Sequence, residues 1–469
     1  MKHLLIVTNN FPPSKTIGTQ RILRICKFLD RTKWKISVLT LKESYYPFPE
    51  FDWEDPAYQY LRDVSVYRTN RFDVVGFLIN FREFLRAKKS GKIENPTPVK
   101  TAPVKSKSSS NSGQGTSSNV GAWQRIKDFV TDMMQFPDSN ITWLPIAFLK
   151  GRKIIKQEKV DVLFSTSPHH SLHLITSLLK ITTGKKLVID FRDPWARSPW
   201  DEKTRSENGF ERWKHRRIIG MEKWVLKKAD QISLITAEMK QDYIQHHPKV
   251  PAAKFKLFNN GFDPDKLHTN GTVSTDNGKK PAKVTFIHAG SLYKERDPTP
   301  VLNALKMLKS ANRITADDVE FVFMGAITFH LKHIKALTTE LGLDDLVTFI
   351  SKVSYQESIA HMAKSHVLML LQPVTKVQLP GKFYDYITMD KPILAVAEKD
   401  SSVENIIKDR FGIFADIRNV ASIAEAISTL IENPHYNIDK IRECRKEFDM
   451  SKSITTFENI LEVSASQQQ

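Results

Sequence analysis

The sequence predicts an α/β protein with two doubly wound parallel sheets, and two observations support this fold class. Short apolar runs alternate with helical patterns through most of the 469 residues, which is typical of parallel strands joined by crossover helices. A polar stretch near the middle, residues 268–282, separates two such series. Because a chain of this length usually forms two or three domains, we expect two Rossmann-like domains that face each other across a cleft.

The expected strands are short apolar runs bounded by polar or turn-forming residues. In the first half of the chain they are Leu4–Val7, Ile36–Leu39, Val162–Ser165, Leu187–Ile189 and Gln231–Ile235. In the second half they are Val284–His288, Val319–Met324, Val347–Ile350, Val367–Leu371, Ile393–Val396 and Gly412–Phe414. Near the C-terminus, the segments with helical patterns are Ala421–Glu432 and Ile438–Glu447.

Two segments lack the apolar side chains that a folded core requires. Residues 95–122 are rich in Ser, Pro, Gly and Lys, so we expect a disordered insertion there. Residues 268–282 form the expected linker. The predicted organisation is an N-terminal domain at 1–267, a C-terminal domain at 283–447 and a tail at 448–469 that packs back on the N-terminal domain.

The composition is that of a folded, water-soluble protein with an excess of positive charge. The chain has 70 Lys and Arg against 52 Asp and Glu, a net charge of +18, which favours polyanions or anionic lipid as partners. Its two cysteines, Cys26 and Cys444, form no C-x-x-C motif. The first apolar run is too short for a signal peptide, and no run approaches the roughly 18 apolar residues that span a bilayer. We therefore expect a cytoplasmic protein that is not integral to the membrane.

The segment LPGKFYDY, residues 379–386, carries the most informative polar pattern in the chain. It predicts a turn at Gly381 and a short helix on which Lys382 and Asp385 lie on one face. An ammonium beside a helix N-terminus suits phosphate oxygens, and the carboxylate can accept hydrogen bonds from sugar hydroxyls. A nucleotide-sugar diphosphate offers both kinds of group. A surface ion pair on an ordinary helix is the alternative.

Loops that follow other strands of the second half add to this pattern, because the carboxyl ends of parallel strands meet at one edge of a sheet. Gly290 and Ser291 follow the first of these strands, and Gly290 would let a ligand approach the backbone. Arg296 would grip a diphosphate without a metal. Gly325 and Ile350 end the next two strands, and backbone groups near Ile350 could read a nucleobase.

Two loops of the first half carry further candidate contacts. Gly18 stands at the entry to the first predicted helix, where backbone can approach a ligand, although an ordinary turn explains such a glycine equally well. The loop after the third strand contains His169, which could hydrogen-bond a sugar or a phosphate. A solvated loop histidine is the alternative.

The segment DFRDPW, residues 190–195, is the densest polar cluster of the first half, and it lies at a predicted strand end. Asp193 could orient an acceptor hydroxyl, and Trp195 could stack on a sugar face. The alternative is an ion pair between Arg192 and Asp193 that supports the turn.

No motif indicates a metal or a cofactor. Lys382 follows a glycine but lacks the earlier glycine of a P-loop. Asp263-Pro264-Asp265 spells D-x-D, but its place at a domain border favours an ordinary turn cap. We find no H-E-x-x-H motif and no Ser, His and Asp arrangement for nucleophilic catalysis.

Together these residues resemble the family 4 glycosyltransferases of the GT-B fold, over nearly the whole chain except residues 95–122. The resemblance rests on the order and spacing of several short motifs. They are Phe11-Pro12-Pro13 with Gly18 and Arg21, Ser167-Pro168-His169, Asp190–Trp195, Asn260–Asp263, Gly290–Arg296, and Pro380–Tyr386 with Lys391-Pro392-Ile393.

The resemblance implies a retaining, metal-independent transfer of a sugar from a nucleotide-diphosphate donor to a glycan or lipid-linked acceptor, in cell-surface polysaccharide synthesis and without a cofactor. The C-terminal domain would bind the donor and the N-terminal domain the acceptor. At matching positions, Arg296 would hold the donor pyrophosphate, Asp385 would hydrogen-bond the ribose, and Gly18 would meet the donor phosphates.

Three positions depart from the family pattern. Ser291 replaces the Arg that usually follows the strand-end glycine, and Lys382 is the candidate substitute for that cation. Val377 stands where the first acid of the E-x7-E motif is expected, and Arg192 stands where many relatives carry a histidine. The expected catalytic residues are Arg296, Lys382, Asp193 and Arg192; the donor contacts are Gly18, Gly290, Ser291, Arg296, Gly325, Ile350, Lys382 and Asp385; and the acceptor or sugar contacts are His169, Asp190 and Trp195.

Residues 211–228 have the pattern of a basic helix with interleaved tryptophans, which suits an anionic membrane surface. The same aromatics could instead pack on the first domain. We therefore include peripheral contact with the inner face of the cell membrane among the expected partners. Two other functions stay open: a non-catalytic scaffold, because of Ser291 and Val377, and a basic nucleic-acid-binding protein. The second ranks low because no recognised nucleic-acid motif appears, so we expect no nucleic-acid partner.

Overall fold

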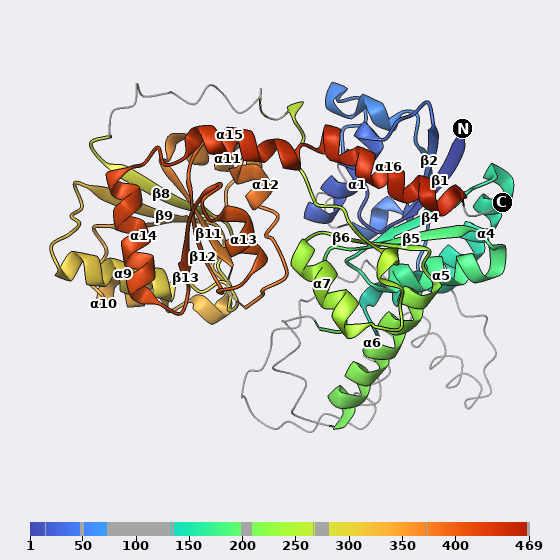
Figure 1. Cartoon of the computed structure of the whole chain (residues 1–469), viewed down its shortest axis with the longest axis horizontal. Coiled ribbons are helices and arrows are strands. Elements are labelled where there is room, and N and C mark those ends of the chain that lie inside the picture. Colours follow the sequence, from blue (N-terminus) through green and yellow to red (C-terminus); the bar gives the residue numbers. More distant parts are fainter. Residues whose placement is uncertain are drawn as a thin grey trace, which may run out of the picture. The chain divides into compact units, whose positions relative to one another are not determined.

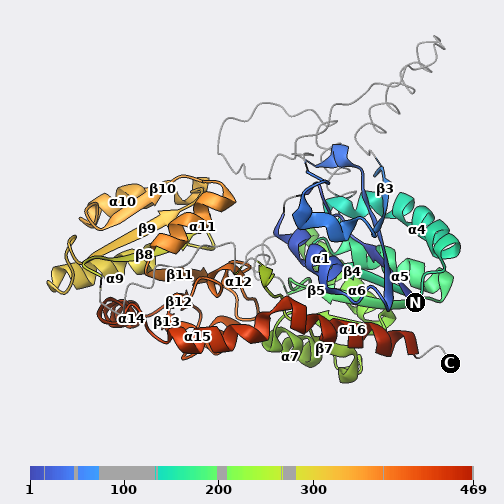
Figure 2. The same ribbon diagram turned by 90° about the horizontal axis from the view of Figure 1, so that it is seen from above.

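The computed structural model describes residues 1–14, 16–46, 51–72, 133, 136–197, 209–265, 267, 281–372 and 374–466. These residues form two compact units. Unit 1 combines Met1–Ser233, Lys249–Lys256 and Glu458–Gln469, and unit 2 combines Leu234–Pro248 with Leu257–Phe457. Each unit contains one sheet flanked by helices (Figure 1, Figure 2), so the predicted α/β class with two parallel-sheet domains is confirmed. The predicted insertion and most of the predicted linker lie outside the described residues, and the predicted domain limits stay predictions.

Unit 1 is built on a seven-stranded sheet in the order β3-β2-β1-β4-β5-β6-β7. Neighbouring strands pair in parallel, as in the register of Leu4 with Ile36 and with Val162. The inner strands are buried except at Lys2, Lys35 and Lys186, because helices cover both faces of a parallel sheet. The strands are β1 (Lys2–Val7), β2 (Trp34–Leu41), β3 (Ser65–Thr69), β4 (Val162–Thr166), β5 (Lys186–Phe191), β6 (Gln231–Leu234) and β7 (Phe255–Leu257).

The helices of unit 1 connect these strands as crossovers. In Figure 1, α1 and the C-terminal part of α16 lie on one side of the sheet and α5 lies on the other, as right-handed crossovers from the two central strands require. The α-helices are α1 (Ile17–Phe28), α4 (Leu144–Glu158), α5 (Ser171–Thr183) and α6 (Gly209–Lys228), and the short 3-10 helices lie at Glu43–Tyr45, Pro56–Leu61, Ser139–Trp143 and Ala252–Lys254.

Unit 2 is built on a six-stranded sheet in the order β10-β9-β8-β11-β12-β13. The strand order reverses between β8 and β11, which is the point where open parallel sheets usually bind ligands at their carboxyl ends. The strands are β8 (Val284–Ala289), β9 (Val319–Met324), β10 (Val347–Ile350), β11 (Val367–Gln372), β12 (Ile393–Ala397) and β13 (Gly412–Asp416).

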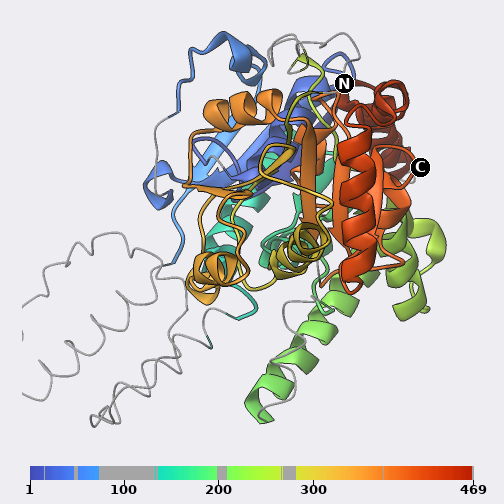
Figure 3. The same ribbon diagram turned by 90° about the vertical axis from the view of Figure 1, so that its left-hand side faces the viewer.

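Two apolar cores lie on the two faces of this sheet, because side chains alternate along each strand. Phe286 packs with α9 and α14 on one face, and Ile287 packs with α11, α12 and α13 on the other; in Figure 3, α14 lies in front of the strands. The α-helices are α7 (Ala237–His246), α9 (Thr299–Ser310), α10 (Ile334–Glu340), α11 (Tyr355–Lys364), α12 (Phe383–Tyr386), α13 (Ser402–Ile407), α14 (Val420–Glu432), α15 (Ile438–Cys444) and α16 (Met450–Ser466). The 3-10 helices lie at Phe329–Leu331 and Arg445–Phe448.

The last helix, α16, begins in unit 2 and ends in unit 1. At its start, the Met450 N–H donates to the Phe262 carbonyl at 3.1 Å. In its second half, Glu458 Oε1 accepts a hydrogen bond from the Asp30 N–H at 2.7 Å. The chain end is therefore fixed by polar contacts in both units.

All eleven predicted strands are present, within two residues at each end. Among the residues that the structure describes, the strands that the sequence did not reveal are β3 and β7. Strand β3 is a half-buried edge strand with alternating polar residues, and β7 has three residues. The predicted helix at Lys382 is present but has only four residues, so a helix N-terminus contributes little to any phosphate site there.

Candidate functional site

The first polar cluster lies in unit 2, at the carboxyl ends of β8 and β11. Gly290 follows β8, and a Cβ built on it would overlap Nζ and Cε of Lys382. The Lys382 ammonium therefore lies directly over the Gly290 backbone, and any larger residue at 290 would displace it. The Gly290 N–H donates to the Met324 carbonyl at 2.7 Å, so this glycine serves to admit the lysine and not to offer its N–H to a ligand.

The position of Lys382 follows from how α12 is anchored. The Tyr386 hydroxyl accepts from the Ala289 N–H at 3.0 Å and donates to the Met369 carbonyl at 3.2 Å. One side chain of α12 thus bridges β8 and β11, and the lysine that precedes the helix is held at the edge of the sheet.

Arg296 reaches the same edge from the loop after β8. Its Nε donates to the Leu371 carbonyl at 3.1 Å and its Nη2 donates to Gln372 Oε1 at 3.3 Å, so the guanidinium is bound to the end of β11. Burial, followed by the positive charge of Arg296, lowers the pKa of Lys382 to about 8, and Asp385 offsets part of this effect. The two cations that were predicted to act together are therefore close enough to repel each other.

His288 lies beneath these cations and was not predicted from the sequence. Its Nδ1 donates to the Met369 carbonyl at 3.0 Å, which leaves the lone pair on Nε2. Among the described residues Nε2 has no hydrogen-bond partner, and it lies 3.2 Å from the Cβ position of Gly290. Burial, with the charges of Lys382 and Arg296, holds the pKa of His288 well below its ordinary value. His288 is thus a neutral, buried side chain that lies near both cations without a hydrogen bond from Nε2 to another described residue.

The other predicted donor contacts lie along the same edge. The Gly325 N–H donates to the Ile350 carbonyl at 2.9 Å, and Gly325, with φ of +149°, packs against the backbone of Gly290. Ser291 is exposed. Asp385 Oδ1 accepts from the Tyr355 hydroxyl at 3.3 Å. Two cations and several polar groups at a strand-order reversal suit a diphosphate, which needs positive charge held in place.

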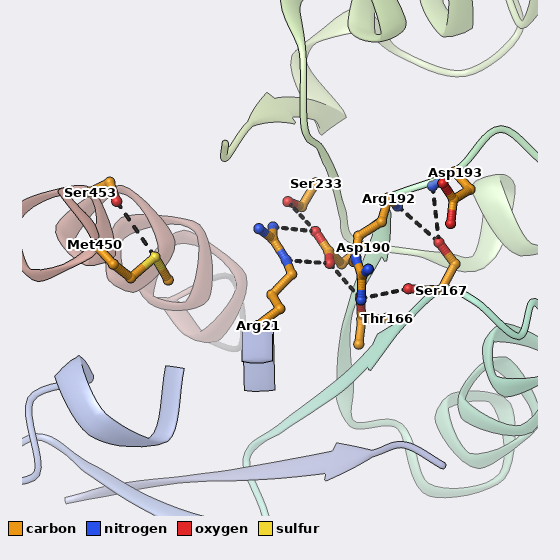
Figure 4. Close-up of polar contacts among 9 residues, drawn as sticks. All are labelled: Arg21, Thr166, Ser167, Asp190, Arg192, Asp193, Ser233, Met450 and Ser453. Atoms are coloured by element: carbon orange, nitrogen blue, oxygen red, sulfur yellow. Dashed lines mark hydrogen bonds and ion pairs between the residues drawn. The ribbon is translucent and has the colours of Figure 1, made fainter. Parts of the chain in front are cut away.

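The second polar cluster lies in unit 1, at the carboxyl end of β5 (Figure 4). Asp190 is fully buried and forms a two-point ion pair with Arg21, at 2.8 Å from Nε to Oδ2 and 2.7 Å from Nη2 to Oδ1. The hydroxyls of Thr166 and Ser233 donate to the same carboxylate at 2.6 Å and 2.8 Å. Burial alone would raise the pKa of Asp190, but Arg21 and these donors hold it below its ordinary value. The predicted contact of Asp190 with a sugar does not fit this enclosed position.

Arg192 and Asp193 begin the loop after β5. Their N–H groups donate to Ser167 Oγ at 2.8 Å and 3.4 Å, which joins this loop to the loop after β4. The ion pair between the two side chains, which was the alternative interpretation, is not formed by the buried Nε and Nη1 of Arg192, because these atoms have no hydrogen-bond partner in the described part of the chain. Asp193 is half-buried, and its role toward an acceptor hydroxyl stays a prediction.

Trp195 does not fit the role that the sequence suggested for it. It is buried, and its ring stacks on His170 with the centroids 5.0 Å apart, so that face is not open to a sugar. His169 is half-buried, and its Nδ1 accepts from the Asn9 amide at 3.0 Å. Its proton is then on Nε2, which keeps His169 a candidate donor to a substrate oxygen.

Gly18 is explained by a contact within unit 1. A Cβ at this position would come within 2.5 Å of Asn10 Nδ2, which donates to the Pro168 carbonyl at 2.9 Å. The space above Gly18 is therefore filled by a side chain that joins the loops after β1 and β4. The predicted approach of a ligand to the Gly18 backbone does not fit this arrangement.

Two kinds of feature are absent from the described residues. No group of three or more His, Cys, Asp and Glu side chains there is close enough to hold a metal ion. Within the same residues, no helix combines the length and the apolar character needed to cross a membrane.

Two family models match the sequence. "Glycosyltransferase Family 4" matches residues 123–266, and "Glycosyl transferases group 1" matches residues 272–447. The two models together account for more than half of the chain. No curated protein matches it.

Solved structures with the same fold include three proteins of low sequence identity. Sucrose-phosphate synthase from Thermosynechococcus elongatus aligns with a TM-score of 0.61 and 10% identity over 99% of this chain and all of that chain. Anabaena HepE, in complex with UDP and glucose, gives 0.58 and 14% over 99% and 100%. The lipopolysaccharide outer core galactosyltransferase WaaB gives 0.57 and 12% over 98% and 99%.

Proposed function

The chain belongs to the family 4-like glycosyltransferases of the GT-B fold, and we propose that it transfers a sugar from a nucleotide-diphosphate donor with retention of anomeric configuration and without a metal ion. The acceptor in this proposal is a glycan or a lipid-linked sugar of cell-surface polysaccharide synthesis. Both the donor class and the acceptor class are part of the proposal.

The observation that carries the proposal is the pair of cations at the strand-order reversal of unit 2. Arg296 is bound to the end of β11 and Lys382 lies over Gly290, so both charges are in place before a ligand arrives. In many enzymes, fixed donors aimed at developing negative charge lower the barrier more than any other group does, and removing one commonly costs about 10²–10³ in rate. Lys382 supplies the charge that the family usually places at position 291.

The solved structures support the donor and the setting. HepE was solved with UDP and glucose, the two parts of a nucleotide sugar, and WaaB is described as a lipopolysaccharide galactosyltransferase. We propose that Ser291, Gly325 and Ile350 line the donor site and that Asp385 hydrogen-bonds the ribose.

The proposed reaction needs no separate acid. The acceptor oxygen bonds to the anomeric carbon while the bond from that carbon to the diphosphate oxygen breaks. The acceptor proton passes to the departing phosphate oxygen on the same face, which retains the configuration. Arg296 and Lys382 stabilise the negative charge on the diphosphate, and Asp193 and His169 orient the acceptor.

Ligand binding and product analysis test the proposal. Thermal unfolding with a panel of nucleoside diphosphates and their sugar conjugates should identify a ligand that stabilises the protein, by about 2.7 kcal/mol at 100 times its Kd. Arg296→Ala and Lys382→Ala should abolish the shift, whereas Lys309→Ala, which removes a surface charge paired with Asp345, should keep it.

The mechanism is tested with the donor found in this way. Transfer should continue in EDTA, and NMR should show the donor's anomeric configuration in the product. Failure of every nucleotide to bind, or equal binding by the Arg296 and Lys382 variants, would reject the proposed donor site.

We further propose that α6 contacts an anionic membrane from the cytoplasmic side. Trp213 is 37% exposed, Arg217 lies over its ring at 5.3 Å, and a surface hollow along the helix is lined by Arg216, Arg217 and Trp224. Basic side chains beside exposed aromatics suit anionic lipid. Co-sedimentation with vesicles should depend on anionic lipid and weaken in Trp213→Ala; equal binding to neutral vesicles would exclude this contact.

A further inference from the structure

The Asp190 carboxylate is saturated by its neighbours. An ionised carboxylate offers about four lone-pair sites. Asp190 fills them with Nε and Nη2 of Arg21 and with the hydroxyls of Thr166 and Ser233 (Figure 4). No further donor can be satisfied by this group.

Arg192 is the second guanidinium at this strand end, and within the described residues its Nε and Nη1 have no such partner. The residue is only 9% exposed. Its backbone N–H is bonded to Ser167 Oγ, but its Nε and Nη1 donate to no acceptor in the described part of the chain. A buried, charged donor that has lost water and gained no acceptor is strongly destabilising.

The nearby charges do not remove this imbalance. Asp193 and Asp190 favour the charged form of Arg192, whereas Arg21 and Arg24 disfavour it. Because Asp190 is already bound to Arg21, the end of β5 holds more buried positive charge than its own carboxylates neutralise through hydrogen bonds. One added anion with two or more oxygens would satisfy both the charge and the free donors.

We propose that Arg192 binds an anionic group, a carboxylate or a phosphate, on the acceptor of unit 1. This inference rests on the proposed glycosyl transfer. The acceptor is favoured over the donor because Arg192 lies in unit 1 beside Asp193, the residue proposed to orient the acceptor, whereas the diphosphate has its own cations in unit 2. The acceptor sugar is then an acidic sugar or a sugar phosphate.

Stability distinguishes this role from a structural one. If Arg192 awaits a ligand, Arg192→Met removes an unsatisfied charge and should raise the Tm of the ligand-free protein by a few degrees. If Arg192 instead holds the loop in place, the same change should lower Tm. A lower Tm would therefore overturn the proposal.

Binding of three related probes to the full chain completes the test. Glucuronate carries a carboxylate, glucose 6-phosphate carries a phosphate, and glucose is the neutral control. One of the two anions should bind at least about tenfold more tightly than glucose, and which one does so identifies the anionic group. Arg192→Gln should abolish this preference, while Arg62→Gln, at an exposed ion pair with Glu54, should leave it unchanged.

Binding of a nucleoside diphosphate to the same samples separates this inference from the proposed function. Arg192→Gln should not alter that binding. A loss as large as that of Lys382→Ala would place Arg192 on the donor diphosphate and overturn the proposal, as would the absence of any preference for an anion in the unsubstituted chain. Anion preference without nucleotide binding would instead reject the proposed donor.

Discussion

Lys382 is held where its own charge is unfavourable until an anion arrives. Burial and the charge of Arg296 lower its pKa to about 8, and the nearby His288 is neutral and adds no negative charge that would offset this. A bound diphosphate would reverse this effect by adding negative charge. Lys382 should therefore take up a proton when the ligand binds above its free pKa.

This coupling predicts a pH dependence of nucleoside diphosphate binding. The pKa of Lys382 is lowered in the free protein and rises in the complex, so affinity should fall, by up to about tenfold per pH unit, as pH rises above about 8. Calorimetric titration between pH 7.5 and 9.5, where the phosphate charge is constant, would measure it. Lys382→Arg stays charged and should bind with little change over this range; parallel curves for the two proteins would contradict the assignment.

The same lowered pKa has the opposite effect on the free protein. Between about pH 8 and the ordinary value of 10.5 the unfolded chain binds more protons at Lys382 than the folded chain does. The contribution of Lys382 to the free energy of unfolding should therefore increase as the pH rises through that window.

The Arg21–Asp190 pair predicts a large effect on stability. Asp190→Asn would leave Arg21 buried without a counter-charge and should lower the free energy of unfolding by about 3–5 kcal/mol. Glu54→Gln, in an exposed pair with Arg62, should change it by less than about 1 kcal/mol. Urea denaturation of the two variants gives both values. If both variants lost a similarly small free energy of unfolding, the buried pair would contribute no more to stability than the exposed one.

The positions of the charged residues were easier to predict from the sequence than their burial. The motif around Lys382 and Arg296 placed both residues at one sheet edge, because parallel strands end together. The same logic gave Asp190 and Trp195 exposed roles, yet both are enclosed by residues distant in the sequence, Arg21 and Ser233 for the acid and His170 for the ring. His288 gave only a weak signal, a polar residue inside an apolar strand.

Among the elements, the glycines at strand ends illustrate two distinct roles. At Gly290 an added Cβ would meet the flexible end of Lys382, whereas at Gly412, the first residue of β13, it would meet the backbone of Ile393. Gly412 also has φ of +156°, which strains other residues. Gly290 thus leaves room for the Lys382 side chain in the site, whereas Gly412 lets β13 pair closely with β12.

These roles predict opposite outcomes for two matched variants. Gly290→Ala should leave the free energy of unfolding nearly unchanged but weaken nucleoside diphosphate binding at least about tenfold, because it displaces the ammonium. Gly412→Ala should cost about 1–3 kcal/mol of stability and leave binding intact. Denaturation and calorimetry on both proteins would show this; the reverse pattern would place the ligand elsewhere.

Element type was predictable wherever apolar runs were long and buried. Strand β3 escaped because an edge strand needs no continuous apolar run, and β7 because three residues carry too little pattern. The short helix predicted at Lys382 is present as α12 and begins one residue later, at Phe383. Its position depends on the Tyr386 hydroxyl, a contact that no local pattern encodes.

For the whole molecule, each unit has one sheet with a polar cluster at the carboxyl ends of its strands. Unit 2 presents two cations at one sheet edge, as a donor diphosphate requires. In unit 1 the side chains of Asn10 and Asp190 are hydrogen-bonded to other groups of the protein. The buried Nε and Nη1 of Arg192 have no acceptor among the described residues. The proposed chemistry divides in the same way, with the leaving group in unit 2 and the acceptor in unit 1.

Hydrogen–deuterium exchange, with and without a saturating nucleoside diphosphate, tests the central claim most directly. If Arg296 and Lys382 hold the diphosphate, exchange should slow in residues 289–297 and 379–387 of unit 2. The β4 and β5 strand ends of unit 1 should change little with this ligand. Protection confined to unit 1, or unchanged exchange in both unit 2 segments while the nucleotide is bound, would contradict the account.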